Sequence, residues 1–285
     1  MARRAWRFLM LSVVVASLFA AAVLGEPLRV CLDFFPNPNH VPLYAALGEG
    51  LLARQGIDVD IVVPSNPSDP VKLAAVRTLD IALTPQINYL IARDEGLPLI
   101  AIGALIGGAL GGLLSVEPER IARLEDLAGG RIGYSLAPLE PVLWRTMLAC
   151  SGVDPGSVEL IHVGFNTMAS LLAGTVDAIG AFRNYEPIQA ELFGRIPLFF
   201  PQEAYCIPET YDILIVAHPA LLEERSLELH AFLSALAAAV EMTRADPEHA
   251  FALFLQAHPE LDVELSLRYF EATLPLFAKG LRHDD

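Results

Sequence analysis

Strand-like and helix-like segments alternate along this chain from residue 28 to residue 217. Strand-like runs at 28–33 and 131–134 are each followed by a longer stretch that predicts a helix, at 42–55 and at 140–150, and 178–182 is a further strand-like run. This alternation is typical of α/β proteins, in which helices cover both faces of a mostly parallel sheet. Beyond residue 217 the pattern is helical, and Pro247 and Pro259 mark breaks on either side of a helix predicted over 247–257. The sequence therefore predicts an α/β fold with a helical C-terminal region.

The length of the chain favours two lobes over one compact body. About 260 residues follow the first 25, which is more than a single core commonly reaches. A helix, a tight turn and a strand also occur twice in similar form, at 73–82 and at 170–179. Paired glycines between 107 and 112 precede the point, near Glu117, where we expect the first crossing between lobes. We predict that residues 26–116 begin lobe one, 117–211 form lobe two, and 212–285 return to lobe one and end in helices.

The first 25 residues have the pattern of a secretory signal peptide. Arg3, Arg4 and Arg7 precede an apolar run from residue 8 to residue 24, and small residues stand before Glu26. An uncleaved signal anchor is the alternative, because the run is nearly long enough to span a bilayer. Cys31 is not preceded by the small residues of a lipoprotein signal. We expect an exported, periplasmic or otherwise extracytoplasmic protein that carries no lipid.

Cysteine content and charge narrow the class of protein further. With Cys31, Cys150 and Cys206, one thiol must remain unpaired, so in an oxidising compartment we expect buried free thiols or at most one bridge. The formal net charge of −15 opposes binding to phosphate backbones, so we expect no nucleic acid partner.

Signatures of the common catalytic classes are absent from the sequence. The seven histidines form no cluster with metal-ligand spacing, and no Gly-x-Ser-x-Gly motif occurs. The two lysines, Lys72 and Lys279, lie far from the candidate pocket segments, which disfavours a Schiff-base enzyme. We therefore expect a protein without metal, cofactor or catalysis.

Polar and aromatic residues gather where the predicted strands end, which is where an open α/β sheet usually binds its ligand. The candidate ligand-binding residues are Asp33, Phe34, Asn37, His40, Tyr44 and Tyr89 in the first lobe, and Asn166, Asn184, Tyr185 and Glu186 in the second. Aromatic faces can cover a flat ring while amides and carboxylates bind its edge. Structural roles are the alternative: Asn166 can cap a helix, Glu186 can favour a helix dipole, and His40 can pack against the first helix.

Five motifs resemble those of the periplasmic substrate-binding proteins of the thiamine-pyrimidine-precursor type. They are Asp33-Phe34-Phe35-Pro36-Asn37-Pro38-Asn39-His40, Pro42-Leu43-Tyr44, Val163-Gly164-Phe165-Asn166, Asn184-Tyr185-Glu186-Pro187-Ile188-Gln189, and residues 205–208. The same superfamily contains riboflavin, sulfonate and nitrate binders and the fungal pyrimidine synthases. The resemblance implies a two-lobed, type II "Venus flytrap" protein, each lobe a mixed sheet flanked by helices. It also implies capture of a formylated aminomethyl-pyrimidine, or a close relative, for an ABC permease in the inner membrane.

The resemblance also assigns roles to individual positions. Phe34 stands where the family usually has a stacking Trp, and Tyr185 supplies the opposing aromatic face. Asn37, His40 and Tyr44 shape the first-lobe wall, while Glu186 accepts the exocyclic amine of the pyrimidine.

Two alternatives to a pyrimidine binder remain open. One is another flat heterocycle such as riboflavin, or a small sulfonate, for which Arg183 is the one arginine well placed at a strand exit. The other is an enzyme like the fungal synthases, which consume their own histidine and a lysine-bound pyridoxal cofactor. The cysteine-rich motif of those enzymes is absent from this sequence.

Overall fold

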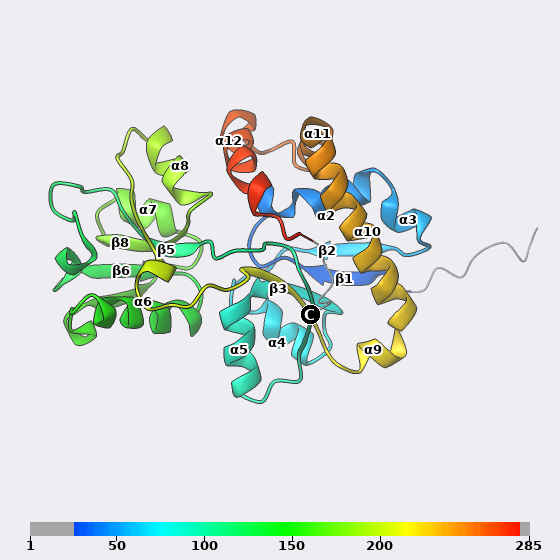
Figure 1. Ribbon diagram of the computed structural model, residues 1–285, viewed down its shortest axis with the longest axis horizontal. Coiled ribbons are helices and arrows are strands. Elements are labelled where there is room, and N and C mark those ends of the chain that lie inside the picture. Colours follow the sequence, from blue (N-terminus) through cyan, green and yellow to red (C-terminus); the bar gives the residue numbers. More distant parts are fainter. Residues whose placement is uncertain (1–25, 280–285) are drawn as a thin grey trace, which may run out of the picture.

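A computed structural model describes residues 26–279 as two lobes that lie side by side, each built on a five-stranded sheet (Figure 1). The predicted signal peptide, residues 1–25, lies outside the described residues. Among residues 26–279 no helix has both the length and the apolar character needed to span a bilayer.

The first sheet has the strand order β2-β1-β3-β10-β4. Its strands are β1 (Leu28–Cys31), β2 (Val59–Val62), β3 (Ile81–Pro85), β4 (Ile100–Ala104) and β10 (Ile213–Ala217). β1 runs parallel to β2 and β3, whereas β10 runs antiparallel to β3 and β4. The sheet is therefore mixed, because a strand that returns from the other lobe enters it in the opposite direction.

Helices cover both faces of the first sheet. They are α2 (Val41–Gly48), α3 (Leu51–Arg54), α4 (Pro70–Ala75), α5 (Gln86–Asp94), α9 (Leu221–Glu224), α10 (Ser226–Ala245), α11 (Pro247–Ala257) and α12 (Val263–Thr273). Alternate residues of β3 point to opposite sides: Ile81 and Leu83 pack with α2, α10 and α11, and Ala82 packs with α4 and α5. A single helix predicted over 42–55 is divided at Gly50, whose φ of 67° is left-handed.

The second sheet repeats this arrangement in the order β7-β6-β8-β5-β9. It consists of β5 (Gly111–Ser115), β6 (Arg131–Tyr134), β7 (Glu159–His162), β8 (Ala178–Phe182) and β9 (Leu198–Pro201), with α6 (Leu139–Cys150), α7 (Thr167–Leu172) and α8 (Glu186–Leu192). Leu113 packs on the α6 side and Leu114 on the side of α7 and α8. Helices therefore cover both faces of this sheet as well.

The repeated unit in the sequence has the same contacts in both lobes. Asp80 Oδ2 accepts the backbone N–H of Arg29 at 2.8 Å, and Asp177 Oδ2 accepts that of Arg131 at 2.7 Å. Each aspartate thereby joins the start of one strand to the parallel strand beside it, β3 to β1 and β8 to β6.

The two lobes are joined by two crossings that use equivalent strands. β5 lies beside β8 in the second sheet, as β10 lies beside β3 in the first. The first crossing thus lies between β4 and β5, earlier than the position near Glu117 that the sequence suggested. The paired glycines explain the difference: a Cβ at Gly112 would stand 2.4 Å from the carbonyl oxygen of Phe200, so this glycine belongs to the closely packed sheet and not to a loop before it.

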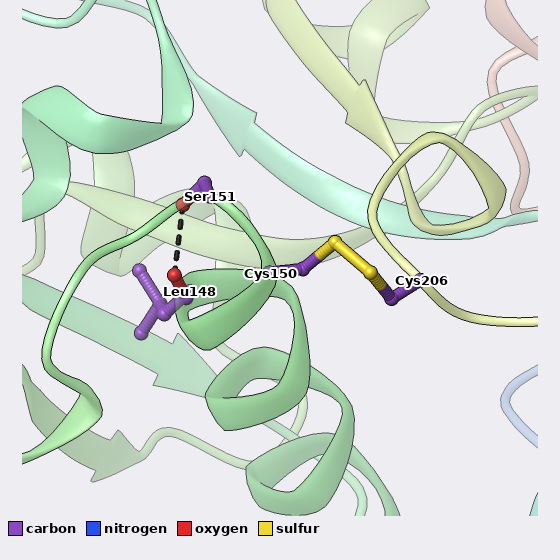
Figure 2. The surroundings of a disulfide bond; sticks show 4 residues. All are labelled: Leu148, Cys150, Ser151 and Cys206. Atoms are coloured by element: carbon purple, nitrogen blue, oxygen red, sulfur yellow. Dashed lines mark hydrogen bonds between the residues drawn. A yellow bond between two sulfur atoms is a disulfide. The ribbon is translucent and has the colours of Figure 1, made fainter.

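One disulfide bond lies in the second lobe. It joins Cys150, at the end of α6, to Cys206, in the segment that follows β9 (Figure 2). The two Cα atoms are 6.0 Å apart, within the usual range for a bridge. Cys31 is buried and free. From three cysteines the sequence predicted either free thiols only or one bridge, and the structure has one bridge.

Candidate ligand-binding site

A cavity of about 890 Å³, part of it open to solvent, lies between the lobes. Both lobes contribute residues that follow the ends of strands, as the strand-exit argument predicts for this class of fold. The polar and aromatic lining residues are Asp33, Phe34, Asn37, Asn39, Gln86, Ser135, Glu140, Trp144, Phe182, Tyr185, Glu186, Gln202, Thr210, Tyr211 and Asp212.

Half of the residues nominated from the sequence lie on this wall. Asp33, Phe34 and Asn37 come from the loop after β1, and Tyr185 and Glu186 come from the start of α8. The structure thus brings residues of the two motifs, 33–40 and 184–189, to the wall of one cavity. Whether these side chains bind the ligand remains a prediction.

His40 lies behind the wall and orients Asp33. It is fully buried, and its Nδ1 accepts the backbone N–H of Asn37 at 3.2 Å. The Nε2 atom therefore carries the proton and donates it to Asp33 Oδ1 at 2.8 Å. This leaves the second oxygen of Asp33 for other contacts.

Tyr44, Tyr89 and Asn166 lie away from the cavity wall. The Tyr44 ring packs edge-on against His258, with ring centroids 4.4 Å apart, and Tyr89 packs against the apolar cluster beside α4 and α5. Asn166 is exposed before α7, and its side chain makes no capping hydrogen bond. The sequence could not separate these positions from the cavity wall, because burial and side-chain direction depend on tertiary packing.

Asn184 links the lobes to each other. Its Nδ2 donates to Asn39 Oδ1 at 2.8 Å and to Thr273 Oγ1 at 2.7 Å, so one side chain of the second lobe holds two elements of the first. Aromatic rings add to this contact: Phe34 lies 4.7 Å from Phe165 between centroids. The described conformation is therefore one in which the lobes touch.

Replacing Asn184 by alanine is expected to favour separation of the lobes. Two hydrogen bonds of about 1 kcal/mol each are lost, which shifts the equilibrium between closed and open forms by roughly tenfold or more. Small-angle X-ray scattering of the ligand-free variant should give a larger radius of gyration than the unmodified protein. Asn166→Ala is the matched control, and identical scattering from Asn184→Ala and Asn166→Ala would contradict a linking role.

Three buried carboxyl groups on the wall have raised pKa values. Burial raises the pKa of Glu140 and of Glu186 to about 7, against partial compensation by hydrogen bonds, and each of the two carboxyls accepts a backbone N–H. Ser135 N–H donates to Glu140 Oε2 at 2.8 Å, and Phe182 N–H donates to Glu186 Oε2 at 2.7 Å.

Asp212, just before β10, is the third of these carboxyls. Burial raises its pKa to about 7, and the neighbouring Asp33 acts in the same direction. Its Oδ2 accepts the backbone N–H of Leu110 at 2.6 Å. Its Oδ1 is buried and has no hydrogen-bond partner in residues 26–279. A buried acceptor without a partner is costly, so a donor on a bound ligand would stabilise it.

The α6 side of the cavity contains residues that were not predicted from the sequence. Glu140 and Trp144 lie one helical turn apart on α6 and both face the cavity, although Trp144 is only 1% exposed. A Cβ at Gly180 would stand 2.7 Å from Glu140 Oε2, so this glycine makes room for α6. A signal for these residues was present in the sequence. Ser135 directly follows β6, and residues spaced four apart on the helix that comes next, Glu140 and Trp144, lie on one helix face.

The acidic groups do not form a metal centre. Across residues 26–279 no group of three or more His, Cys, Asp or Glu side chains is arranged to hold a metal ion. The cavity instead offers carboxylate acceptors and flat apolar faces, a combination that suits a small ring bearing hydrogen-bond donors.

Comparison with protein families and known sequences gives a consistent result. The family model described as NMT1/THI5 like matches residues 37–250. A Haemophilus influenzae protein named for thiamine biosynthesis is 34% identical over 91% of this chain and 83% of its own. The formylaminopyrimidine-binding protein of Halalkalibacterium halodurans is 29% identical over 97% of this chain and 87% of its own. A Legionella pneumophila protein named 4-amino-5-hydroxymethyl-2-methylpyrimidine phosphate synthase is 25% identical over 93% of this chain and 84% of its own.

Solved structures confirm the fold. The periplasmic aliphatic sulphonate-binding protein SsuA of Escherichia coli superposes with a TM-score of 0.70 at 17% identity, covering 89% of this chain and 80% of that one. At this identity the likeness concerns the fold alone. The chain has the two-lobed fold of the periplasmic solute-binding proteins that serve ABC importers, as the sequence predicted.

Proposed function

The chain belongs to the NMT1/THI5-like family, and from this premise we propose that it captures an aminopyrimidine precursor of thiamine between its lobes and delivers it to an ABC permease. The observation that carries this proposal is the composition of the cavity wall, which holds four carboxyl groups and no Lys, Arg or His among the described residues. A 4-aminopyrimidine presents an amine beside a ring nitrogen, so it can donate hydrogen bonds to such a wall.

The aromatic residues suit the faces of the same ring. Phe34 and Tyr185 reach the cavity from the two lobes, and Trp144 reaches it from α6. Flat rings stack on such side chains, while Glu186, with one oxygen held by the Phe182 N–H, presents the other to an amine. Phe34 covers less area than the Trp usual in this family, which makes it the position where we expect altered ligand preference.

A sulfonate is the main alternative, because sulfonate binders share the fold. An anion needs a cationic or hydrogen-bond-donating wall. Arg183, the candidate from the sequence, is not among the lining residues, and its Nη2 donates to Glu203 Oε1 at 2.5 Å. The acidic wall therefore favours a pyrimidine over a sulfonate. Riboflavin is a neutral heterocycle, so the charge of the wall does not separate it from a pyrimidine, and a binding panel that contains both ligands is needed.

Binding without catalysis also agrees with the position of His40. The synthase-like alternative would consume this histidine, yet both of its ring nitrogens are engaged, by Asn37 and by Asp33, and the ring is fully buried. The synthase-named relative is more distant in sequence than the formylaminopyrimidine-binding one. These observations favour capture and release of an unchanged ligand.

We place this binding outside the cytoplasm. The signal-like pattern of residues 1–25, the Cys150–Cys206 bridge and the periplasmic location of the structural neighbours all support export. A permease in the inner membrane is the partner that this location and fold require.

Glu186→Gln tests the proposed function directly. The variant keeps an oxygen for the Phe182 N–H but loses the negative charge, so binding of 4-amino-5-hydroxymethyl-2-methylpyrimidine should weaken about tenfold or more while the fold is kept. Isothermal titration calorimetry measures the affinity, and thermal melting checks the fold.

The matched control for this test is Glu119→Gln, because Glu119 is exposed and lies outside the cavity. Equal affinity of Glu186→Gln and the unmodified protein would remove Glu186 from the site. Binding of sulfonates or riboflavin in the same panel, without binding of any aminopyrimidine, would overturn the proposed function.

A further inference from the structure

The four carboxyl groups of the cavity wall form two pairs. Burial is the main cause of the raised pKa values of Glu186 and Asp212, and the charge of Glu140 acts in the same direction on Glu186, as the charge of Asp33 does on Asp212. Arg183 is the charged group that acts on Asp212 in the opposite direction, and it is itself paired with Glu203. Glu186 is the carboxyl proposed above for the exocyclic amine, which leaves the pair of Asp33 and Asp212 without an assigned ligand group.

The second pair has unused acceptors. Asp33 Oδ1 is occupied by His40, and Asp212 Oδ2 by Leu110, but Asp212 Oδ1 is buried and accepts no hydrogen bond from any described residue. Asp212 is 5% exposed, so water does not hydrate it freely. An acceptor that is both buried and paired with a second acid calls for a donor that carries positive charge.

The backbone places Asp212 and Glu186 close to each other. Glu186 is held by the N–H of Phe182, and Asp212 by the N–H of Leu110. Gly111, the next residue after Leu110, is the register partner of Phe182 in the β5–β8 pair, and Arg183 N–H donates to the Leu110 carbonyl at 2.9 Å. The two carboxyls are therefore anchored at neighbouring points of two paired strands and line the same cavity, so that one ligand can contact both.

We infer that this cavity selects an aminopyrimidine whose neighbouring side arm is a primary ammonium, in preference to the same ring with a neutral formylated arm. The inference rests on the proposed function and specifies its ligand. An ammonium arm donates up to three hydrogen bonds and neutralises charge at the pair of Asp33 and Asp212. A formylamino arm carries no charge, offers one N–H, and adds a carbonyl oxygen that the carboxylates repel.

Three ligands with the same ring separate these possibilities. They are the 5-hydroxymethyl, 5-aminomethyl and 5-formylaminomethyl forms of 4-amino-2-methylpyrimidine, titrated calorimetrically at pH 7 in phosphate and in Bis-Tris, neither of which contains a primary amine or a sulfonate. We expect the aminomethyl form to bind about tenfold tighter, or more, than either neutral form. The heat of binding of the aminomethyl form should differ between the two buffers, because the ammonium favours the ionised carboxylates and binding therefore releases protons to the buffer. For the same reason the affinity for the aminomethyl form should rise from pH 6 to pH 8.

Asp212→Asn locates the effect. Asparagine keeps an oxygen for the Leu110 N–H, so the variant should fold, lose about tenfold in affinity for the aminomethyl form, and bind the hydroxymethyl form within about threefold of the unmodified protein. Asp94→Asn, at an exposed position at the end of α5, is the matched control. If Asp212→Asn does not fold, the three-ligand comparison and the proton release on the unmodified protein decide the question alone.

The outcomes separate this inference from the proposed function. Formylated ligand bound as tightly as, or tighter than, the aminomethyl form overturns the inference and leaves aminopyrimidine capture intact. Binding of none of the three forms overturns the proposed function, and the inference with it.

Discussion

Replacing both Cys150 and Cys206 with serine is expected to lower the free energy of unfolding by about 3 to 4 kcal/mol, because the bridge closes a loop of 56 residues. The bond constrains the unfolded chain from α6 to the segment after β9. These elements belong to the second lobe, so the unfolding transition of the second lobe should move to lower urea concentration while that of the first lobe changes little. Urea unfolding of the double variant, followed by circular dichroism, measures the loss.

Cys31→Ser is the control for the cysteine exchange, since Cys31 is free and lies in the first lobe. It should remove one thiol without removing a cross-link. Peptide mapping under non-reducing conditions should recover the segments that contain Cys150 and Cys206 as one linked species. Recovery of both as separate thiol peptides, together with unchanged stability of the double variant, would contradict the bridge.

The ligand-free protein is expected to lose stability as the pH rises from 5 to 7. Glu140, Glu186 and Asp212 have folded-state pKa values of about 7, whereas ordinary unfolded values are near 4. Between these values the folded state binds more protons than the unfolded state, so stability is greatest at the acid side and falls with rising pH. One such group accounts for about 2 kcal/mol between pH 5 and pH 7.

Thermal melts at several pH values measure this slope. The lowered pKa of Asp177 acts only at more acid pH, so it leaves this interval unaffected. Glu140→Gln should flatten the decline because glutamine stays neutral throughout, while Asp94→Asn should not. Stability that is constant or rises between pH 5 and pH 7 would show that the buried carboxyls are ionised already.

Most of the fold could be predicted from local sequence pattern. The strands at 131–134 and 178–182 and the helix at 247–257 coincide with the structure, because apolar periodicity and Pro247 mark them clearly. The helix break at Gly50 was not predicted, because a glycine inside a helical pattern can either be part of the helix or end it, and the sequence does not distinguish the two. The first crossing was predicted too late in the sequence. Gly111 and Gly112 indicate that another part of the backbone packs closely against them, but the sequence does not show which strand this is.

The candidate site was only half predictable. Residues that directly follow strands, such as Phe34 and Tyr185, are marked by composition. In the sequence, Glu140 and Trp144 belong to an ordinary amphipathic helix, and Asp212 is the first residue of a predicted strand. Only the pairing of β5 with β8 and the crossing before β10 bring these residues to the cavity. The burial that raises their pKa values is a property of tertiary structure.

Trp144 gives the cavity a spectroscopic reporter of its own. The sequence has two tryptophans, Trp6 and Trp144, and Trp6 lies in the first 25 residues. Once that segment is removed, all indole emission comes from one ring that lines the cavity beside Glu140. Ligand capture, and ionisation of that carboxyl, should therefore change emission intensity and wavelength without any added label, so stopped-flow fluorescence can follow lobe closure in real time.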